Sequence, residues 1–217
     1  MDETLDLIQA QGARMSEVAR RDPDRPIPQY PGWSMSDLVA HTGSVLGRTT
    51  VVCRESRQER PETPQLPAGA DATDWFDDQL AQMLGVLSDA DPATVVWGFG
   101  SQPSVGFWKQ RMLIEVGVHR FDAERAWGDP DPLTDEVAIA GLDEFDDMWL
   151  PRLGEVPTIR VHAADVDRSW DYGEGDPEAE ISGTASDLYL RLMLRPAPIV
   201  LPTEWADALA SLSTPAG

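Results

Sequence analysis

Apolar residues recur at intervals of three and four along most of the first 150 residues, which is the spacing of amphipathic helices. The pattern predicts five helices: residues 4–21, a second after Ser34 or Ser36, a third after Asp71 or Thr73, a fourth within 101–130, and a fifth from Thr134 to Pro151. Prolines mark residues 23–32 and 56–70 as exposed connections, and residues 94–100 are predicted to be extended.

After residue 153 the pattern changes to strand-like alternation. Residues 158–173 predict a strand pair, residues 178–183 a third strand, residues 185–195 a helix and the region from about Thr203 a last short helix. The expected fold is therefore α+β and mainly α, with a helical bundle over residues 1–153 and a small α/β domain over residues 154–217.

Composition narrows the class of protein. With 217 residues and 41% hydrophobic residues, the chain is large enough to bury a core. Seventeen basic residues against thirty-eight acidic ones give a formal charge of −21, which argues against nucleic-acid and anionic-membrane partners. The beginning of the chain lacks a basic and apolar leader pattern, and Cys53 is the single cysteine, so we expect a cytoplasmic protein.

Glu115 and His119 lie four positions apart within the fourth predicted helix. Positions i and i+4 project from the same side of a helix, so the carboxylate and the imidazole can bind one metal ion together. His41 lies on the apolar face of the second predicted helix, in register with Leu38 and Val45, and is the natural third ligand.

Two interpretations of these three residues remain open. Glu115 and His119 could be an ordinary i,i+4 pair and His41 a core histidine with a backbone partner. Alternatively, two imidazoles and one carboxylate leave open positions on a divalent ion, which is typical of a catalytic zinc site. Zinc, nickel, iron(II) and manganese all fit this set of ligands.

Two cations are best placed near this site. Arg111 lies one turn before Glu115, and Arg48 lies two turns after His41. Either could bind a carboxylate of a substrate or of a thiol cofactor, or could simply pair with a nearby acid. Trp108 is a candidate wall or lid of the site, although a tryptophan in such a helix is more often part of the core.

Asp122, three residues after His119, also has two open interpretations. It could orient the imidazole of His119, or it could form a salt bridge with Arg120 or Arg125 on the helix surface.

The segments WSMSDLVAHTG and FWKQRMLIEVGVHRFDAERAWG resemble the mycothiol-dependent maleylpyruvate isomerase family. This resemblance implies a DinB-like up-and-down four-helix bundle that binds zinc through His41, Glu115 and His119. GTASDLYLRLMLR resembles the helix of the family's sterol-carrier-like C-terminal domain, where Arg195 is the best match to a functional arginine. Met193 and Leu194 depart from the tryptophan and glycine of the family pattern.

The resemblance implies a metal-dependent, mycothiol-using isomerase or thiol transferase that acts on a small electrophilic substrate through a zinc-activated thiolate. We expect two catalytic residues, Arg111 from its place near Glu115 and Arg195 from the resemblance. Arg48 and Trp108 are the expected cofactor-binding residues from their places in the sequence. The partners would be a small-molecule substrate and a low-molecular-weight thiol, and the chain would be a monomer or a homodimer. Two alternatives are a non-catalytic metal- and ligand-binding protein and a hydrolase that uses zinc-bound water.

Overall fold

The structure is a computed structural model and describes residues 2–101, 103–128 and 130–212. These residues form seven α-helices, one 3-10 helix and one three-stranded sheet, which confirms the mainly helical α+β class. The chain divides into two compact units, Met1–Asp131 and Pro132–Gly217.

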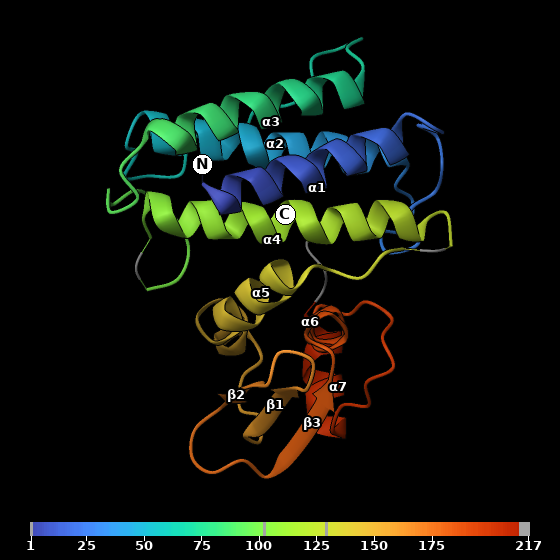
Figure 1. Cartoon of the computed structure of the whole chain (residues 1–217), viewed down its shortest axis with the longest axis vertical. Coiled ribbons are helices and arrows are strands. Elements are labelled where there is room, and N and C mark those ends of the chain that lie inside the picture. The colour runs from blue at the N-terminus through green and yellow to red at the C-terminus, as the bar shows by residue number, and fades with distance from the viewer. Residues whose placement is uncertain (1, 102, 129, 213–217) are drawn as a thin grey trace. The chain divides into compact units, whose positions relative to one another are not determined.

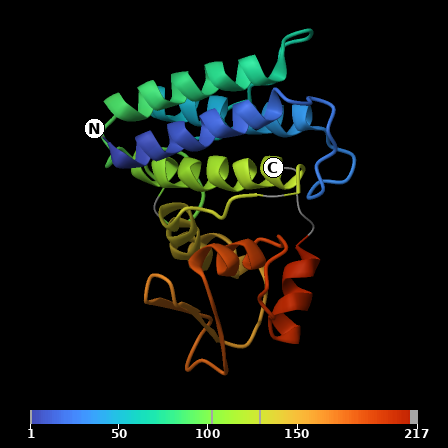
Figure 2. The same ribbon diagram turned by 45° about the vertical axis from the view of Figure 1, so that its right-hand side comes forward.

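The first unit consists of four long helices that lie side by side (Figures 1 and 2). They are α1 (Glu3–Ala19), α2 (Met35–Arg54), α3 (Ala72–Asp89) and α4 (Val105–Arg125). All four match predicted helices. Each begins at a side chain that accepts a hydrogen bond from a backbone N–H of the first turn: Asp2, Ser34, Asp71 and Ser104. Ser34, one of the two predicted starting residues of the second helix, forms a reciprocal capping box with Asp37.

The helices do not alternate strictly in direction. On α3, Trp75 lies against Gly43 of α2 and Gln79 lies against Gly47, so α2 and α3 run parallel. An up-and-down bundle, as expected from the family resemblance, would have α2 and α3 antiparallel, so the expected order does not hold between these two helices. Two parallel helices need a connection that runs back along the helix length, about 27 Å for the 18 residues of α3. Residues 55–71, which contain no helix or strand, are long enough to do this.

The connection between α1 and α2 is fixed at both of its sides. Within it, the backbone N–H of Ile27 donates to Trp33 O at 2.9 Å, and that of Met35 donates to Arg25 O at 2.8 Å. The Arg25 side chain also donates from Nε to the carbonyl oxygen of Ala126, just after α4, at 2.6 Å. The connection is thus tied to both α2 and α4.

The segment 94–100, predicted to be extended, belongs to no sheet. Val95 forms an isolated bridge with Ser104. The backbone N–H of Trp97 donates to the carbonyl oxygen of Arg57 at 2.5 Å. This bond ties the segment before α4 to the connection between α2 and α3.

The second unit contains α5 (Asp135–Met148), a 3-10 turn (Leu150–Arg152), β1 (Ile159–Ala163), β2 (Arg168–Tyr172), β3 (Ala179–Gly183), α6 (Ala185–Leu192) and α7 (Thr203–Ser211). The sheet order is β2-β1-β3, with β1 antiparallel to β2 and parallel to β3. Phe145, Tyr172 and Trp205 stack at the centre of its core, with centroid distances of 4.9 to 6.4 Å.

The compact units divide at residue 131, whereas the sequence pattern placed the domain boundary at residue 153. The difference is α5, which packs against α6 and β2. Tyr172 of β2 donates its hydroxyl to the carbonyl oxygen of Leu142 in α5 at 2.6 Å. Helical periodicity alone cannot distinguish a helix of the bundle from a helix that covers a sheet.

Among the described residues, no helix combines the length with the apolar content that a membrane span requires.

Candidate metal centre

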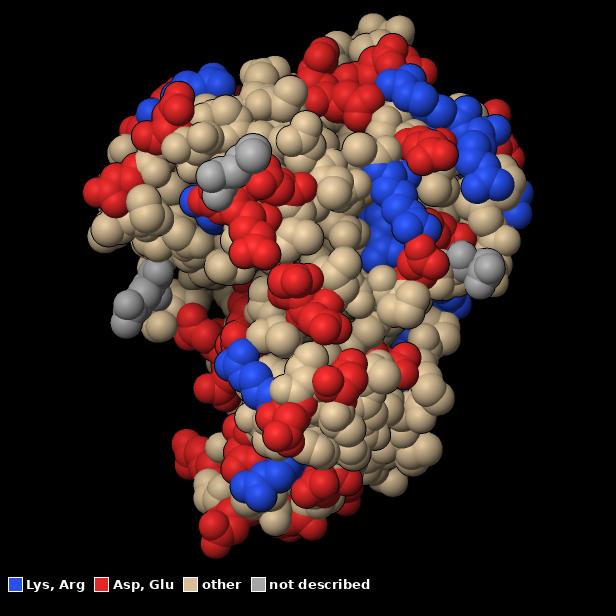
Figure 3. Space-filling view, in the orientation of Figure 1, with Lys and Arg blue, Asp and Glu red and all other residues tan. Residues whose placement is uncertain are grey.

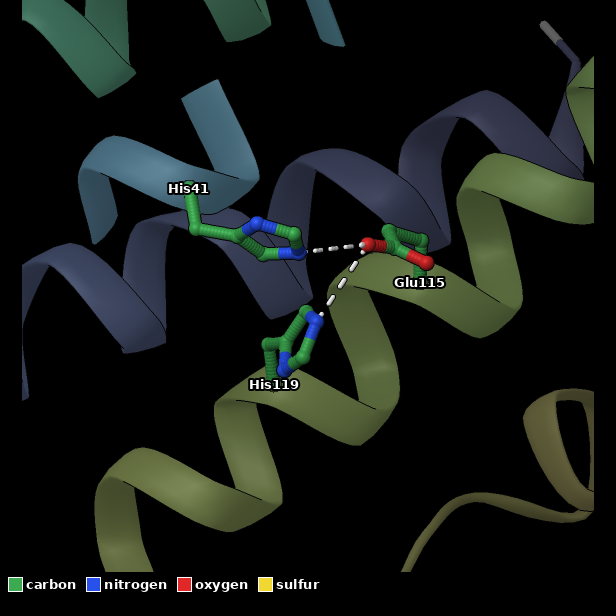
Figure 4. A group of neighbouring side chains, drawn as sticks. All are labelled: His41, Glu115 and His119. Atoms are coloured by element: carbon green, nitrogen blue, oxygen red, sulfur yellow. Dashed lines mark ion pairs between the residues drawn. The ribbon is translucent and has the colours of Figure 1, made fainter. Parts of the chain in front are cut away.

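His41, Glu115 and His119 converge on one point between α2 and α4 (Figure 4). Their ligand atoms all lie within 4.8 Å of one another. Glu115 Oε1 is 3.7 Å from His41 Nε2 and 3.3 Å from His119 Nε2. The two imidazole rings are 5.4 Å apart and nearly perpendicular, so their nitrogens approach from different directions.

Helix geometry explains why the three side chains meet. Glu115 and His119 are one turn apart on α4 and both are buried. His41 lies on the face of α2 that packs against α4, and its side chain keeps 20% exposure. The centre is therefore shielded on the α4 side and open to solvent beside His41.

Neighbouring charges decide the protonation of Glu115 and His119. Burial would raise the pKa of Glu115, but hydrogen bonds with His119 and His41 hold that pKa well below its ordinary value. Burial would lower the pKa of His119, but Asp122 and Glu115 raise it to about 9. Without a metal, the centre is thus an ionised carboxylate facing a protonated imidazole.

Asp122 orients His119. Its side chain is fully buried, and Oδ2 lies 3.2 Å from His119 Nδ1. This contact fits the interpretation of Asp122 as an orienting residue, and the burial of its side chain does not fit a salt bridge on the helix surface. With Nδ1 engaged, Nε2 is the nitrogen of His119 that faces the centre.

The donor set fits a divalent metal ion. Ligand atoms around a tetrahedral zinc ion are roughly 3.3 Å apart, close to the separations between Glu115 and the two histidines. A buried carboxylate, two imidazole nitrogens and an orienting acid are also the groups expected around such an ion.

Arg111 lies directly beside the centre. Its Nη2 donates to Glu115 Oε2 at 3.0 Å. The two oxygens of Glu115 are thereby divided, with Oε1 toward the histidines and Oε2 toward the guanidinium. Arg111 thus forms the ordinary i,i+4 pair that the sequence allowed, but at the edge of the candidate metal centre.

Arg48 is also near the centre, since the charges of Glu115 and Arg111 both act on it. Its side chain is buried on α2, with 7% exposure. Arg60, in the connection between α2 and α3, is a further cation in this neighbourhood. Sequence reasoning missed Arg60, because a basic residue in a proline-rich connection has no periodicity that would place it.

Trp108 is completely buried, so its position does not favour the expected role in binding a cofactor. Its indole Nε1 donates to the carbonyl oxygen of Trp97 at 2.6 Å. Trp97 is half-buried and lies beside Arg48 and Arg60. Trp108 therefore supports the segment that carries Trp97.

Two aromatic residues before α2 also border the centre and were missed. The ring of Trp33 is 5.2 Å from that of His41, the ring of Tyr30 is 6.0 Å from that of His119, and the two rings are 4.8 Å apart. Trp33 begins the segment WSMSDLVAHTG that carries the family resemblance, whereas Tyr30 is marked in the sequence only as an aromatic residue in the proline-rich loop that leads into α2.

Arg195 belongs to the second unit and follows α6. It is buried, and its Nη1 donates to the carbonyl oxygen of Met193 at 2.8 Å. The backbone N–H groups of Leu194 and Arg195 bond to Arg191 O and Leu190 O, which closes the helix in a Schellman turn. Leu194 has φ +61° at the position where the family pattern has glycine.

The fold and the site together define a class of protein: a four-helix bundle with a candidate metal site, a histidine, glutamate and histidine triad, between two of its helices. Residues 5–124, more than half of the chain, match the family described as Mycothiol maleylpyruvate isomerase N-terminal domain. The chain belongs to this family. The predicted resemblance is confirmed, and membership supports the predicted class of enzyme, an isomerase.

Solved structures agree with this assignment at the level of the fold. A crystal structure of the mycothiol-dependent maleylpyruvate isomerase aligns with TM-score 0.69 at 12% identity, over 93% of this chain and 92% of that one. A histidine-to-alanine mutant of the mycothiol-dependent maleylpyruvate isomerase aligns with TM-score 0.67 at 13% identity, over 87% of each chain. No curated protein matches the sequence.

Proposed function

We propose that this chain is a metal-dependent, mycothiol-using isomerase or thiol transferase that acts on a small electrophilic substrate. The observation that carries the proposal is the meeting of His41, Glu115 and His119 within 4.8 Å in a member of this family. The names of the structural neighbours, which are mycothiol-dependent isomerases, support the choice of thiol and reaction.

The chain's own residues have distinct parts in this proposal. His41, Glu115 and His119 hold the metal, and Asp122 keeps His119 Nε2 directed at it. A divalent ion bound there would lower the pKa of a coordinated thiol, so that the thiolate forms at neutral pH. Arg111 holds the carboxylate of Glu115 in place and offers positive charge to an anionic ligand.

The thiol must come from outside the protein. Cys53 is the single cysteine, and burial raises the pKa of its thiol to about 12. It therefore remains a neutral thiol and is a poor nucleophile. A small-molecule thiol such as mycothiol supplies the missing group, and a lone reduced cysteine agrees with a cytoplasmic location.

The test uses the purified full chain with maleylpyruvate as substrate. We expect bound zinc or another divalent ion, thermal stabilisation by mycothiol only when the metal is present, and turnover only with both. Loss of a residue that is hydrogen-bonded to a metal ligand lowers metal affinity by roughly 10–100-fold. His41→Ala removes a ligand itself, so it should lower the affinity by more than this. His162→Ala, the matched control on β1, should bind metal normally.

Each alternative has its own outcome. Turnover of an ester or amide with metal but without thiol would replace this proposal with hydrolysis. Metal and mycothiol binding without conversion of maleylpyruvate or of a simple electrophile would indicate a binding protein. Full metal occupancy in His41→Ala would show that the ligand assignment is wrong.

A further inference from the structure

Arg48 is a buried cation that lacks a complete set of partners. Its side chain is 7% exposed, and among the residues that the structure describes its Nε has no hydrogen-bond partner. Burying a guanidinium without satisfying its donors costs free energy. An acceptor from a bound ligand would offset this cost, which makes Arg48 a candidate binding residue.

The surroundings of Arg48 are strongly positive. Its pKa is lowered, first by burial and then by the charges of Arg60 and Arg111, while Glu115 acts in the opposite direction. Around Arg48 the single carboxylate of Glu115 thus opposes the charges of two further guanidinium groups, and this carboxylate already pairs with Arg111 at 3.0 Å. Such a concentration of positive charge is unusual for a protein with a net charge of −21.

Trp97 provides a fixed wall beside these cations. The guanidinium carbons of Arg48 and Arg60 each lie 6.0 Å from the centre of its ring. Its backbone is held from two sides, since its N–H donates to Arg57 O and its carbonyl oxygen accepts from Trp108 Nε1. The first of these bonds also anchors the connection that carries Arg60.

We propose that Arg48, Arg60 and Arg111 form a binding subsite for a carboxylate group beside the candidate metal centre, with Trp97 as one wall. Planar guanidinium groups bind carboxylates through paired hydrogen bonds, and the free Nε of Arg48 is one such donor. Arg60 is exposed and gives the ligand access from solvent. The ligand class is a small organic acid.

The place of this subsite beside the metal centre rests on the proposed function, but carboxylate binding can be tested without metal, thiol or turnover. Calorimetric titration of succinate into the full chain, without metal or thiol and at constant ionic strength, should show saturable binding. Arg48→Met and Arg60→Gln should each weaken binding roughly tenfold or more. Arg57→Gln, on the same connection and paired with Glu55, is the matched control and should bind like the wild type.

A second measurement separates function from structural support. Without succinate, Arg48→Met should melt a few degrees above the wild type, because it removes an unsatisfied buried charge among like charges. Succinate should raise the melting temperature of the wild type and of Arg57→Gln, but not that of Arg48→Met. A lower melting temperature for Arg48→Met would show that Arg48 is a structural residue and would overturn its place in the subsite.

Other outcomes are equally decisive. Absence of saturable succinate binding, or an equal loss in Arg57→Gln and Arg60→Gln, would overturn the subsite while leaving metal and mycothiol binding intact. Binding of phosphate without binding of succinate would overturn the choice of carboxylate. Succinate binding in a chain that binds neither metal nor mycothiol would sustain the subsite and defeat only the proposed function.

Discussion

His119 illustrates how neighbouring residues give one side chain its chemistry. Asp122 at Nδ1 and Glu115 near Nε2 raise its pKa to about 9, against an ordinary value of 6.5, although burial opposes this. A metal ion needs the neutral imidazole. Metal binding at neutral pH should therefore displace a proton from this residue.

The raised pKa predicts how the stability of the metal-free protein depends on pH. The protonated imidazole of His119 stabilises the fold through its contacts with Asp122 and Glu115. This stabilisation is fully present below about pH 6.5 and is lost as the pH rises through 9. The free energy of unfolding should therefore fall over this range by at most about 3 kcal/mol. Urea unfolding with a chelator at several pH values measures this.

The matched variant for this measurement is Asp122→Asn. The substitution removes the acid at Nδ1, so it should lower the pKa of His119 and flatten the dependence between pH 6.5 and 9. If the wild type showed no loss of stability in that range, His119 would not be protonated in the folded chain as described.

The sequence predicted the residues of the candidate centre that lie on helices. It did not predict those that lie in connections, where no periodic pattern gives the direction of a side chain. His41, Glu115 and His119 lie on regular helices, whose spacing predicts the direction of each side chain. Arg60, Trp97, Tyr30 and Trp33 lie in connections, whose course depends on long-range hydrogen bonds and contacts. Trp108, which was expected at the site, is completely buried, and its indole bonds to the backbone of Trp97.

At the scale of elements, glycines of α2 lie in close contact with side chains of α3. A Cβ added at Gly43 would lie 2.7 Å from the ring of Trp75 and 3.4 Å from the Cα atom of Phe76. The contact with a ring and a backbone atom leaves little room for adjustment. This close approach fixes α2, which carries His41 and Arg48.

Two glycine substitutions should therefore have opposite effects. Gly43→Ala should destabilise the protein by about 1–3 kcal/mol because the helices must separate. Gly85→Ala, in α3 with nothing within 4 Å of the added Cβ, should stabilise it by about 0.5–1 kcal/mol through helix propensity. Denaturant unfolding of both variants tests this, and a neutral Gly43→Ala would show that the helices are packed more loosely.

Element boundaries were largely predictable, because capping residues and prolines are local signals. Ser34 and Asp71 begin their helices as predicted, and Thr184 begins the predicted helix of residues 185–195. Thr134 begins α5 without a side-chain cap bond. The parallel course of α2 and α3 and the membership of α5 in the second unit depend on packing between segments, so no local pattern reveals them.

At the scale of the whole molecule, the net charge of −21 dominates. Acidic side chains are spread over both units on the face shown in Figure 3, and blue patches of lysine and arginine are fewer. Mutual repulsion of so many like charges opposes the compact state. The arginines beside the candidate metal centre stand out against this background.

Screening should therefore stabilise the protein. Raising sodium chloride from about 0.01 to 0.3 M shortens the Debye length from roughly 30 Å to below 8 Å. The melting temperature of the metal-free chain should rise by a few degrees, as measured by calorimetry with an uncharged osmolyte as control. A fall in melting temperature would mean that the attractive pairs, such as Arg120 with Glu124, outweigh the repulsion.

The sequence by itself determined the helices, the strands, the charge and the three candidate ligands, because each follows from local spacing or from composition. Only the tertiary structure decided which segments run parallel, which unit holds α5, and which connections border the centre. These features arise from contacts between residues distant in the chain, such as Trp97 with Arg57 and Gly43 with Trp75. Such contacts depend on shape and hydrogen bonding in three dimensions, and a one-dimensional pattern does not record them.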